Sequence, residues 1–301
     1  MKLIALPAFL TLAALLGGHE AARAATVSSS ATLSDFRITL LDLNLDDGIA
    51  PAIHFGAEGE PPSGGSTSGG IIFRSLANGD ELYNDYYNNS GPVGPFSSAF
   101  GSASQGGTSV SSSLVAGADR LGPHTFTVQG SATAAAGTQA TYQALVLAPG
   151  IFSLSYLLTP HTLVRFDGTI SLYAAINGPA SDQDSATASF DMSAYGVGPS
   201  AGEGSSQYSR DRTGVTVNGP RPSRTLSSRS LSRAVGVSLL NNSSGDISGQ
   251  LVANVHVNGM TSAVPEVSAA WLALVGGGVV GARVGQRRAR IAKRACTNSK
   301  A

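Results

Sequence analysis

One short segment combines residue types that could bind a hard metal ion. Asp42, Asn44, Asp46 and Asp47 precede Gly48. Alternating carboxylates and amides supply the oxygen ligands that calcium requires. The match to an EF-hand loop is partial, because that loop has glycine directly after its third ligand and a bidentate glutamate near its end. Two interpretations therefore stay open, a calcium site and a solvated hairpin turn, and no other cofactor is expected.

A second candidate is an aromatic segment at residues 81–89. Tyr83, Tyr86 and Tyr87 stand there among three asparagines and Asp85. Aromatic faces with nearby polar groups bind sugars or apolar ligands at protein surfaces. The alternative is a packed loop or the edge of a sheet. The lack of tryptophan between residues 26 and 263 argues against a sugar-binding platform.

Arginines are concentrated in one serine-rich stretch of the chain. The six residues are Arg210, Arg212, Arg221, Arg224, Arg229 and Arg233. A cluster of this kind can form a patch for an acidic polysaccharide. The alternative is a solvated strand and loop in which the arginines form local ion pairs.

The sequence contains no zinc-type motif. The histidines at 54, 124, 161 and 256 have no zinc-type spacing, and HExxH does not occur. GxSxG occurs once, at residues 198–202, but the all-β body that the sequence predicts disfavours an α/β-hydrolase. We therefore expect a protein that is not an enzyme. A secreted hydrolase is retained as a third alternative, because the paired carboxylates of a glycosidase are recognised by geometry.

The candidate residues lie among segments that alternate apolar and polar residues. This period of two predicts strands with one buried face at residues 36–40, 126–128, 152–156, 170–176, 188–192 and 251–257. Asn-Gly at 78–79, 177–178, 218–219 and 258–259, and Asp-Gly at 47–48 and 167–168, predict turns. Residues 59–70, 88–113 and 196–206 are rich in small residues and predict surface loops.

These patterns predict an all-β body over residues 25–263. We expect one antiparallel, jelly-roll-like β-sandwich with long Gly/Ser loops. Hydrophobic residues make up 42% of the chain and aromatic residues only 6%, so the core must be built from small and aliphatic side chains. Residues 26–263 hold 17 acidic residues and 10 arginines, a net charge of −7, which argues against nucleic acid as a partner.

The N-terminus has the three parts of a secretory signal peptide. Lys2 is followed by an apolar stretch at residues 3–16 and by the small-x-small site Ala22-Arg23-Ala24. We therefore predict a signal peptide at residues 1–24. Its partners would be the Sec translocon and signal peptidase.

The C-terminus has a motif, an apolar stretch and a basic cluster in that order. Val264, Pro265 and Glu266 precede an uncharged run at residues 269–282. The run includes Trp271, Leu272, Leu274, Gly277 and Gly281, and the basic cluster includes Arg287, Arg288 and Arg290. The positive charges predict that residues 295–301 stay in the cytoplasm. An unprocessed stop-transfer anchor and a buried helix are the alternatives.

This tripartite order resembles the PEP-CTERM sorting signal of exported Gram-negative proteins. Val264, Pro265 and Glu266 match the family motif, and Val267 stands where the family has a second proline. Residues 33–55 and 157–174 are also similar to recurring segments of such proteins. The resemblance implies a sorting tail at residues 264–294 that an exosortase, a membrane-embedded protease, handles during transient insertion in the inner membrane.

We therefore expect an exported, non-enzymatic protein of the cell surface or extracellular matrix. The resemblance implies an association with exopolysaccharide and biofilm. The alternative is a carbohydrate-binding or adhesion module, and the secreted hydrolase is third.

Overall fold

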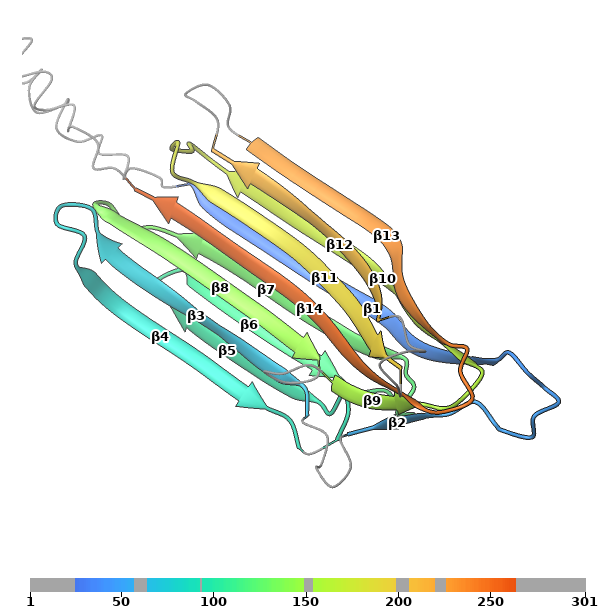
Figure 1. Ribbon diagram of the computed structural model, residues 1–301. Coiled ribbons are helices and arrows are strands. Elements are labelled where there is room, and N and C mark those ends of the chain that lie inside the picture. The colour runs from blue at the N-terminus through green and yellow to red at the C-terminus, as the bar shows by residue number, and fades with distance from the viewer. Residues whose placement is uncertain are drawn as a thin grey trace, which may run out of the picture. The chain divides into compact units, whose positions relative to one another are not determined.

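The computed structural model describes residues 25–56, 64–92, 94–148, 154–198, 206–219 and 226–263, which belong to one compact unit. All regular secondary structure in these residues is β-strand (Figure 1). The strands are β1 (Thr26–Asp42), β2 (Ile53–Phe55), β3 (Ser66–Ser75), β4 (Glu81–Ser90), β5 (Ala99–Gln105), β6 (Thr108–Val115), β7 (His124–Thr133), β8 (Thr138–Ala148), β9 (Leu154–Leu158), β10 (Thr162–Asn177), β11 (Ser185–Val197), β12 (Gln207–Asn218), β13 (Leu226–Asn241) and β14 (Ile247–Ser262). The predicted signal peptide and sorting tail lie outside the described residues. Within the described residues, no helix could span a membrane.

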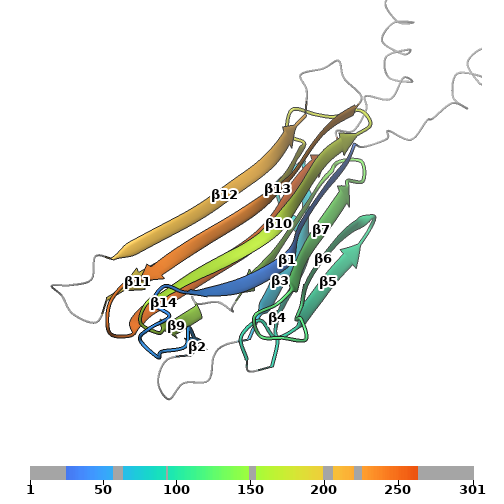
Figure 2. The same ribbon diagram turned by 90° about the vertical axis from the view of Figure 1, so that its right-hand side faces the viewer.

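The strands form two antiparallel sheets, which lie one in front of the other (Figures 1 and 2). The six-stranded sheet has the order β13-β10-β1-β7-β6-β5. The eight-stranded sheet has the order β12-β11-β14-β8-β3-β4, and β9 joins it by pairing with β14 and β2. The prediction of an all-β, antiparallel body is therefore confirmed.

Each sheet turns one face inward, and the two inward faces share a single hydrophobic core. Phe36, Phe126, Ile170, Phe190 and Val255, one from each of five predicted segments, are all buried. Burying one such side chain stabilises the fold by about 1.5–3 kcal/mol. The period of two in the sequence therefore predicts the inward face of these strands correctly.

Tyr142 of β8 connects the two sheets through the core. Its hydroxyl shares a hydrogen bond of 2.7 Å with Ser29 Oγ of β1. Gly130 and Gly259 leave the space that its ring fills, because a Cβ atom at either position would overlap the ring. Glycine in a strand often marks such a close approach.

Two of the predicted turns are wrong. Asn258-Gly259 lies inside β14 and Asp167-Gly168 inside β10, because the apolar alternation continues through each pair and both strands have partners on either side. Gly48, Gly79 and Gly178 do lie at turns, with φ of 71°, 76° and 95°. Positive φ is the backbone conformation that glycine adopts without strain.

Two of the predicted loops are largely strand. β3 begins at Ser66, inside the predicted loop 59–70, and the predicted loop 88–113 holds the end of β4, all of β5 and most of β6. Small residues serve a packing purpose here, since a Cβ atom at Gly69 or Gly101 would collide with the ring of Tyr87. Of the predicted loop 196–206, Gly196 and Val197 belong to β11, and residues 199–205 lie outside the described residues.

Side chains of β12 cover the backbone edge of β13, where the two sheets meet. The Gln207 amide accepts a hydrogen bond from Leu240 N at 3.0 Å and donates one to Leu240 O at 2.7 Å. Asp211 Oδ2 accepts hydrogen bonds from Gly236 N at 3.1 Å and from Arg233 Nη1 at 3.2 Å. Unpaired strand edges invite pairing with another chain. This seam therefore protects the edge of β13.

Candidate functional site

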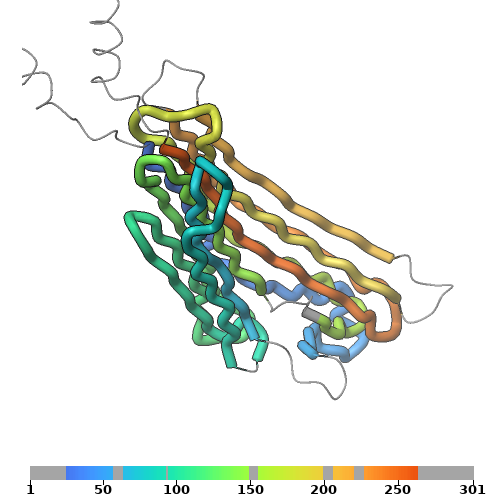
Figure 3. The backbone as a smooth tube through the Cα atoms, turned by 90° about the vertical axis from the view of Figure 1, so that its left-hand side faces the viewer, coloured from blue at the N-terminus to red at the C-terminus, as the bar shows by residue number. Residues whose placement is uncertain are grey.

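The outer face of the eight-stranded sheet is organised in rows that cross the strands. The pairing register aligns the outward residues of neighbouring strands. The tyrosine row consists of Tyr86, Gly70, Gln143, Asn258, Thr187 and Thr216. The methionine row beside it consists of Asn84, Ile72, Thr141, Met260, Ser185 and Asn218. Segments far apart in the chain thus lie side by side, such as β8 and β14, and Figure 3 shows β12, β11 and β14 as neighbouring tubes.

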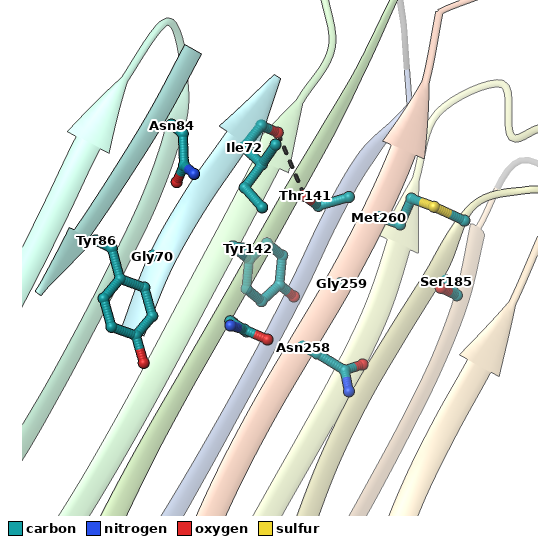
Figure 4. A pocket seen from close by; sticks show the side chains of 11 residues that line it. Gly70, Ile72, Asn84, Tyr86, Thr141, Tyr142, Ser185, Asn258, Gly259 and Met260 are labelled. Atoms are coloured by element: carbon teal, nitrogen blue, oxygen red, sulfur yellow. Dashed lines mark hydrogen bonds between the residues drawn. The ribbon is translucent and has the colours of Figure 1, made fainter. Parts of the chain in front are cut away.

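An open groove of about 270 Å³ lies over these two rows. Figure 4 shows the side chains that line it, from Asn84 and Tyr86 on β4 to Ser185 on β11. It is lined by Gly70, Ile72, Asn84, Tyr86, Thr141, Tyr142, Gln143, Ser185, Asn258, Gly259 and Met260. The sheet supplies a rigid floor, and alternate residues of five neighbouring strands supply the walls.

Gly70 gives Tyr86 its position in the groove. A Cβ atom on Gly70 would lie 2.8 Å from Cδ2 of the tyrosine ring, so a larger residue would displace the ring. The Tyr86 side chain remains 57% exposed. Its ring is therefore held beside the groove but is open to a ligand.

Neutral polar groups dominate the remainder of the lining. Thr141 Oγ1 donates to the carbonyl of Ile72 at 3.3 Å, which is the only side-chain hydrogen bond among the residues drawn in Figure 4. The amides of Asn84, Gln143 and Asn258 thus keep donors and acceptors for a ligand. Amides beside an aromatic ring are suited to binding hydroxylated, partly apolar molecules such as sugars.

Only one of the three clustered tyrosines belongs to this groove. β4 is an edge strand, and its alternation sends Tyr86 outward but Tyr83 and Tyr87 toward the facing sheet. Tyr83 packs edge-on against Phe73, with ring centroids 6.1 Å apart. The Tyr87 hydroxyl bonds Ser112 Oγ at 2.8 Å, and burial raises its pKa. The segment therefore contributes one exposed ring rather than a tyrosine platform.

The acidic segment after β1 uses its side chains to shape the backbone. Asp42 Oδ1 accepts from Asn44 N at 2.9 Å, and Asn44 Oδ1 accepts from Asp46 N at 3.4 Å. Asp47 Oδ1 accepts from Ile49 N at 2.8 Å. These are the local bonds of polar turns. No group of three or more His, Cys, Asp or Glu side chains able to hold a metal occurs among the described residues, so the geometry gives the calcium interpretation no support.

The described arginines of the serine-rich stretch face in different directions. Arg210 lies on the outer face of β12 and forms an ion pair with Asp191 of β11. Arg233 lies in the seam and bonds Asp211, and the hydrogen bonds that it donates lower the pKa of that carboxyl. Two of the arginines are therefore neutralised locally, as the ion-pair interpretation expects. Arg221 and Arg224 lie outside the described residues.

His124 has a structural position at the start of β7. Its Nδ1 accepts from Gly117 N at 3.0 Å, and its Nε2 lies 3.2 Å from the carbonyl of Arg120. Its ring stacks on Phe96 with centroids 4.7 Å apart. Burial lowers the pKa of His124, and both nitrogens are already engaged, so this residue is not available as a general base.

Sequence reasoning found Tyr86 but missed Thr141, Gln143, Asn258 and Met260. All four are outward positions of β8 and β14. The only feature of the sequence that could have indicated them is that the outward positions of β8 and β14 in these rows carry uncharged residues. Comparison with known proteins adds no further residues, since no protein-family model and no curated protein sequence matches the chain.

Proposed function

We propose that this chain is an exported, non-enzymatic protein of the bacterial surface or extracellular matrix, and that its body binds neutral carbohydrate. The observation that carries the binding function is the groove beside Tyr86. It combines an accessible aromatic ring, several uncommitted amides and two apolar side chains, Ile72 and Met260. Sugars present both hydroxyl groups and apolar ring faces, and this lining matches both.

The chemistry of the lining favours binding over hydrolysis at this groove. Glycosidases use a pair of carboxylates placed across the glycosidic bond. None of the residues that line the groove is Asp or Glu. Simple recognition of the sugar chain is therefore the function that this lining supports best.

The fold that we propose is a jelly-roll-like β-sandwich. Its support is the shared core between the two antiparallel sheets and the Tyr142–Ser29 bond that joins them. Such a body can present a flat outer face to a polymer while its core stays closed.

The proposal of export rests on the two ends of the sequence. The signal-like residues 1–24 and the PEP-CTERM-like residues 264–294 imply passage through the Sec translocon and processing by signal peptidase and an exosortase. The mature protein would then reach the surface after a membrane-anchored intermediate. Mass spectrometry of both termini of the native protein tests this part, and two uncut termini on protein from the cell interior would overturn it.

A glycan array tests the binding function. The mature protein should retain one or more neutral glycans saturably, and the variant Tyr86→Ala should lose most of that signal. Tyr173→Ala is the matched control, because Tyr173 is an exposed tyrosine (41%) on the outer face of the other sheet. Equal loss in both variants, or no retained glycan, would contradict the proposal.

A further inference from the structure

We propose that the ligand is an extended neutral polysaccharide that lies across the strands of the eight-stranded sheet and is bound along its interior rather than at an end. This inference rests on the proposed carbohydrate-binding function of the groove. It adds the direction in which the polysaccharide crosses the sheet, the charge of the polysaccharide, and recognition of its interior rather than its end.

The direction follows from the strands that line the groove. Asn84 and Tyr86 belong to β4 at one end, and Ser185 belongs to β11 at the other. Between them lie β3, β8 and β14 in the order of the sheet. Five neighbouring strands spaced about 4.7–4.9 Å apart give a length of about 19 Å. The groove therefore runs perpendicular to the strands.

The spacing of side chains along the groove suits a polymer. Neighbouring strands are separated by about 4.8 Å, which is close to the length of one pyranose unit in an extended chain. The tyrosine and methionine rows are two residues apart along each strand, or about 6.6 Å. Each successive sugar can thus meet one residue from each row, such as Gln143 with Thr141 and Asn258 with Met260.

Both ends of the groove lead to open surface. Within the part of the chain that the structure describes, β4 is the last strand of the sheet on its side, and no further strand lies beyond Tyr86. On the other side the rows continue onto β12 with Thr216 and Asn218, which are both exposed. A long polysaccharide can therefore extend beyond the groove at both ends. The groove would then bind an interior segment of the polysaccharide.

The charge class follows from the composition of the two rows. None of their residues is Asp, Glu, Lys, Arg or His. By register, the nearest arginine is Arg74, one row outside the methionine row. His256 lies in the row on the opposite side, where burial lowers its pKa and favours the neutral ring. An acidic polymer would find no paired cation within the groove, so a neutral one is favoured.

Isothermal titration calorimetry with the mature protein tests the direction of the chain. The probes are neutral gluco-, manno- and galacto-oligosaccharides from dimer to hexamer, with oligogalacturonates as the acidic series. Affinity for the preferred neutral series should rise with length until the chain covers the five strands. Equal affinity for trimer and hexamer would overturn the proposed direction.

Two matched variants place an arginine in the path of a ligand that runs either across or along the strands. Ser185→Arg blocks the β11 end of the groove. Leu145→Arg adds an arginine at the next outward position after Gln143 on β8, outside the groove. Ser185→Arg should weaken hexamer binding about tenfold and trimer binding less than about twofold, the loss of roughly one good contact. Leu145→Arg should change neither by more than about twofold. The reverse pattern, with both variants folded by circular dichroism, would show that the chain runs along the strands.

The remaining outcomes separate this inference from the proposed function. Binding of no neutral oligosaccharide or polymer would defeat the proposed function itself. Tighter binding of oligogalacturonates would overturn only the charge class. A hexamer whose reducing end has been converted to an alditol should bind as the unmodified hexamer does, and a loss of about tenfold or more would show recognition of the chain end.

Discussion

The outer faces of the two sheets have the same construction but different surface chemistry. The six-stranded sheet presents mainly hydroxyl groups, and an open groove there is lined largely by serines of β1, β5, β6 and β7. The eight-stranded sheet presents amides, Tyr86 and Met260 at its groove. Both faces arise from the same alternation along the strands.

The two outer faces differ in the hydrogen bonds that their polar side chains form with one another. On the six-stranded face, short hydroxyls bond each other across strands, as in Ser109–Ser131 at 3.2 Å and Ser171–Ser232 at 3.1 Å. On the eight-stranded face, Thr187 and Thr216 form a similar pair at 3.2 Å. The amides in the groove form no such bond with one another in Figure 4.

The comparison teaches that exposure of polar groups does not by itself make a binding surface. A hydroxyl that bonds its cross-strand neighbour has already used part of its capacity, whereas a longer amide with two donors and an acceptor retains it. Binding should therefore be confined to the eight-stranded face.

The largest expected effect comes from disturbing the packing of Tyr142, which connects the two sheets through the core. Gly130→Ala places a methyl group into the ring of Tyr142, and the free energy of unfolding should fall by about 3 kcal/mol, near the upper range for an overpacked core. Gly214→Ala is the control, because its Cβ atom would lie 3.4 Å from its nearest neighbour. Urea unfolding of both variants measures the difference, and equal stabilities would contradict the packing described for Tyr142.

The seam between the faces should show the next largest effect. Asp211→Ala removes the acceptor of Gly236 N and Arg233, and we expect a loss of about 1–2 kcal/mol from unmet hydrogen bonds. Asp191→Ala removes the more exposed partner of Arg210 and should cost less than about 1 kcal/mol. Because Arg233 lowers the pKa of Asp211, this contribution should be present above the ordinary carboxyl pKa and lost in acid. A larger loss for Asp191→Ala in chemical unfolding would refute this ranking.

Exchanging amide and hydroxyl sharpens the comparison of surface chemistry. Asn258→Ser gives the eight-stranded groove the side chain that is typical of the other face, and glycan affinity should fall about fivefold, or about 1 kcal/mol. Ser30→Asn on the six-stranded face should create no binding. Calorimetry with the preferred glycan measures both, and unchanged affinity of Asn258→Ser would remove this amide from the site.

The smallest effect concerns two histidines in different sheets. Burial lowers the pKa of both His124 and His256 below the ordinary value of 6.5. Protonation therefore favours the unfolded chain, so their contribution is complete above about pH 6.5 and declines as the pH falls toward the folded-state pKa. His256→Gln should flatten this decline by a fraction of the about 1.4 kcal/mol that one pKa unit represents. Unfolding curves between pH 7 and pH 5 measure it, and an unchanged slope would contradict the assignment.

Much of the fold is readable from local pattern alone. Strands such as β7, β10, β11 and β14 alternate large apolar residues with polar ones, and their inward faces are those that the sequence predicts. β3, β5 and β6 escaped prediction because their inward residues include Gly69, Gly101 and Ser112. Small residues carry little local signal, and their role becomes visible only against the Tyr87 ring, which packs beside Gly69 in its own sheet and against Gly101 and Ser112 of the facing sheet.

The candidate site was only partly readable for a related reason. The sequence by itself determined that Tyr86 stands among amides, whereas it predicted a turn at Asn258 and no strand around Gln143. Only the tertiary structure decided that these residues share a groove, because the pairing of β4, β3, β8 and β14 is a non-local choice of register. Alternation is a property of each extended backbone, whereas register depends on which distant strands fit together in the core, and a slip of one residue would turn the whole row inward.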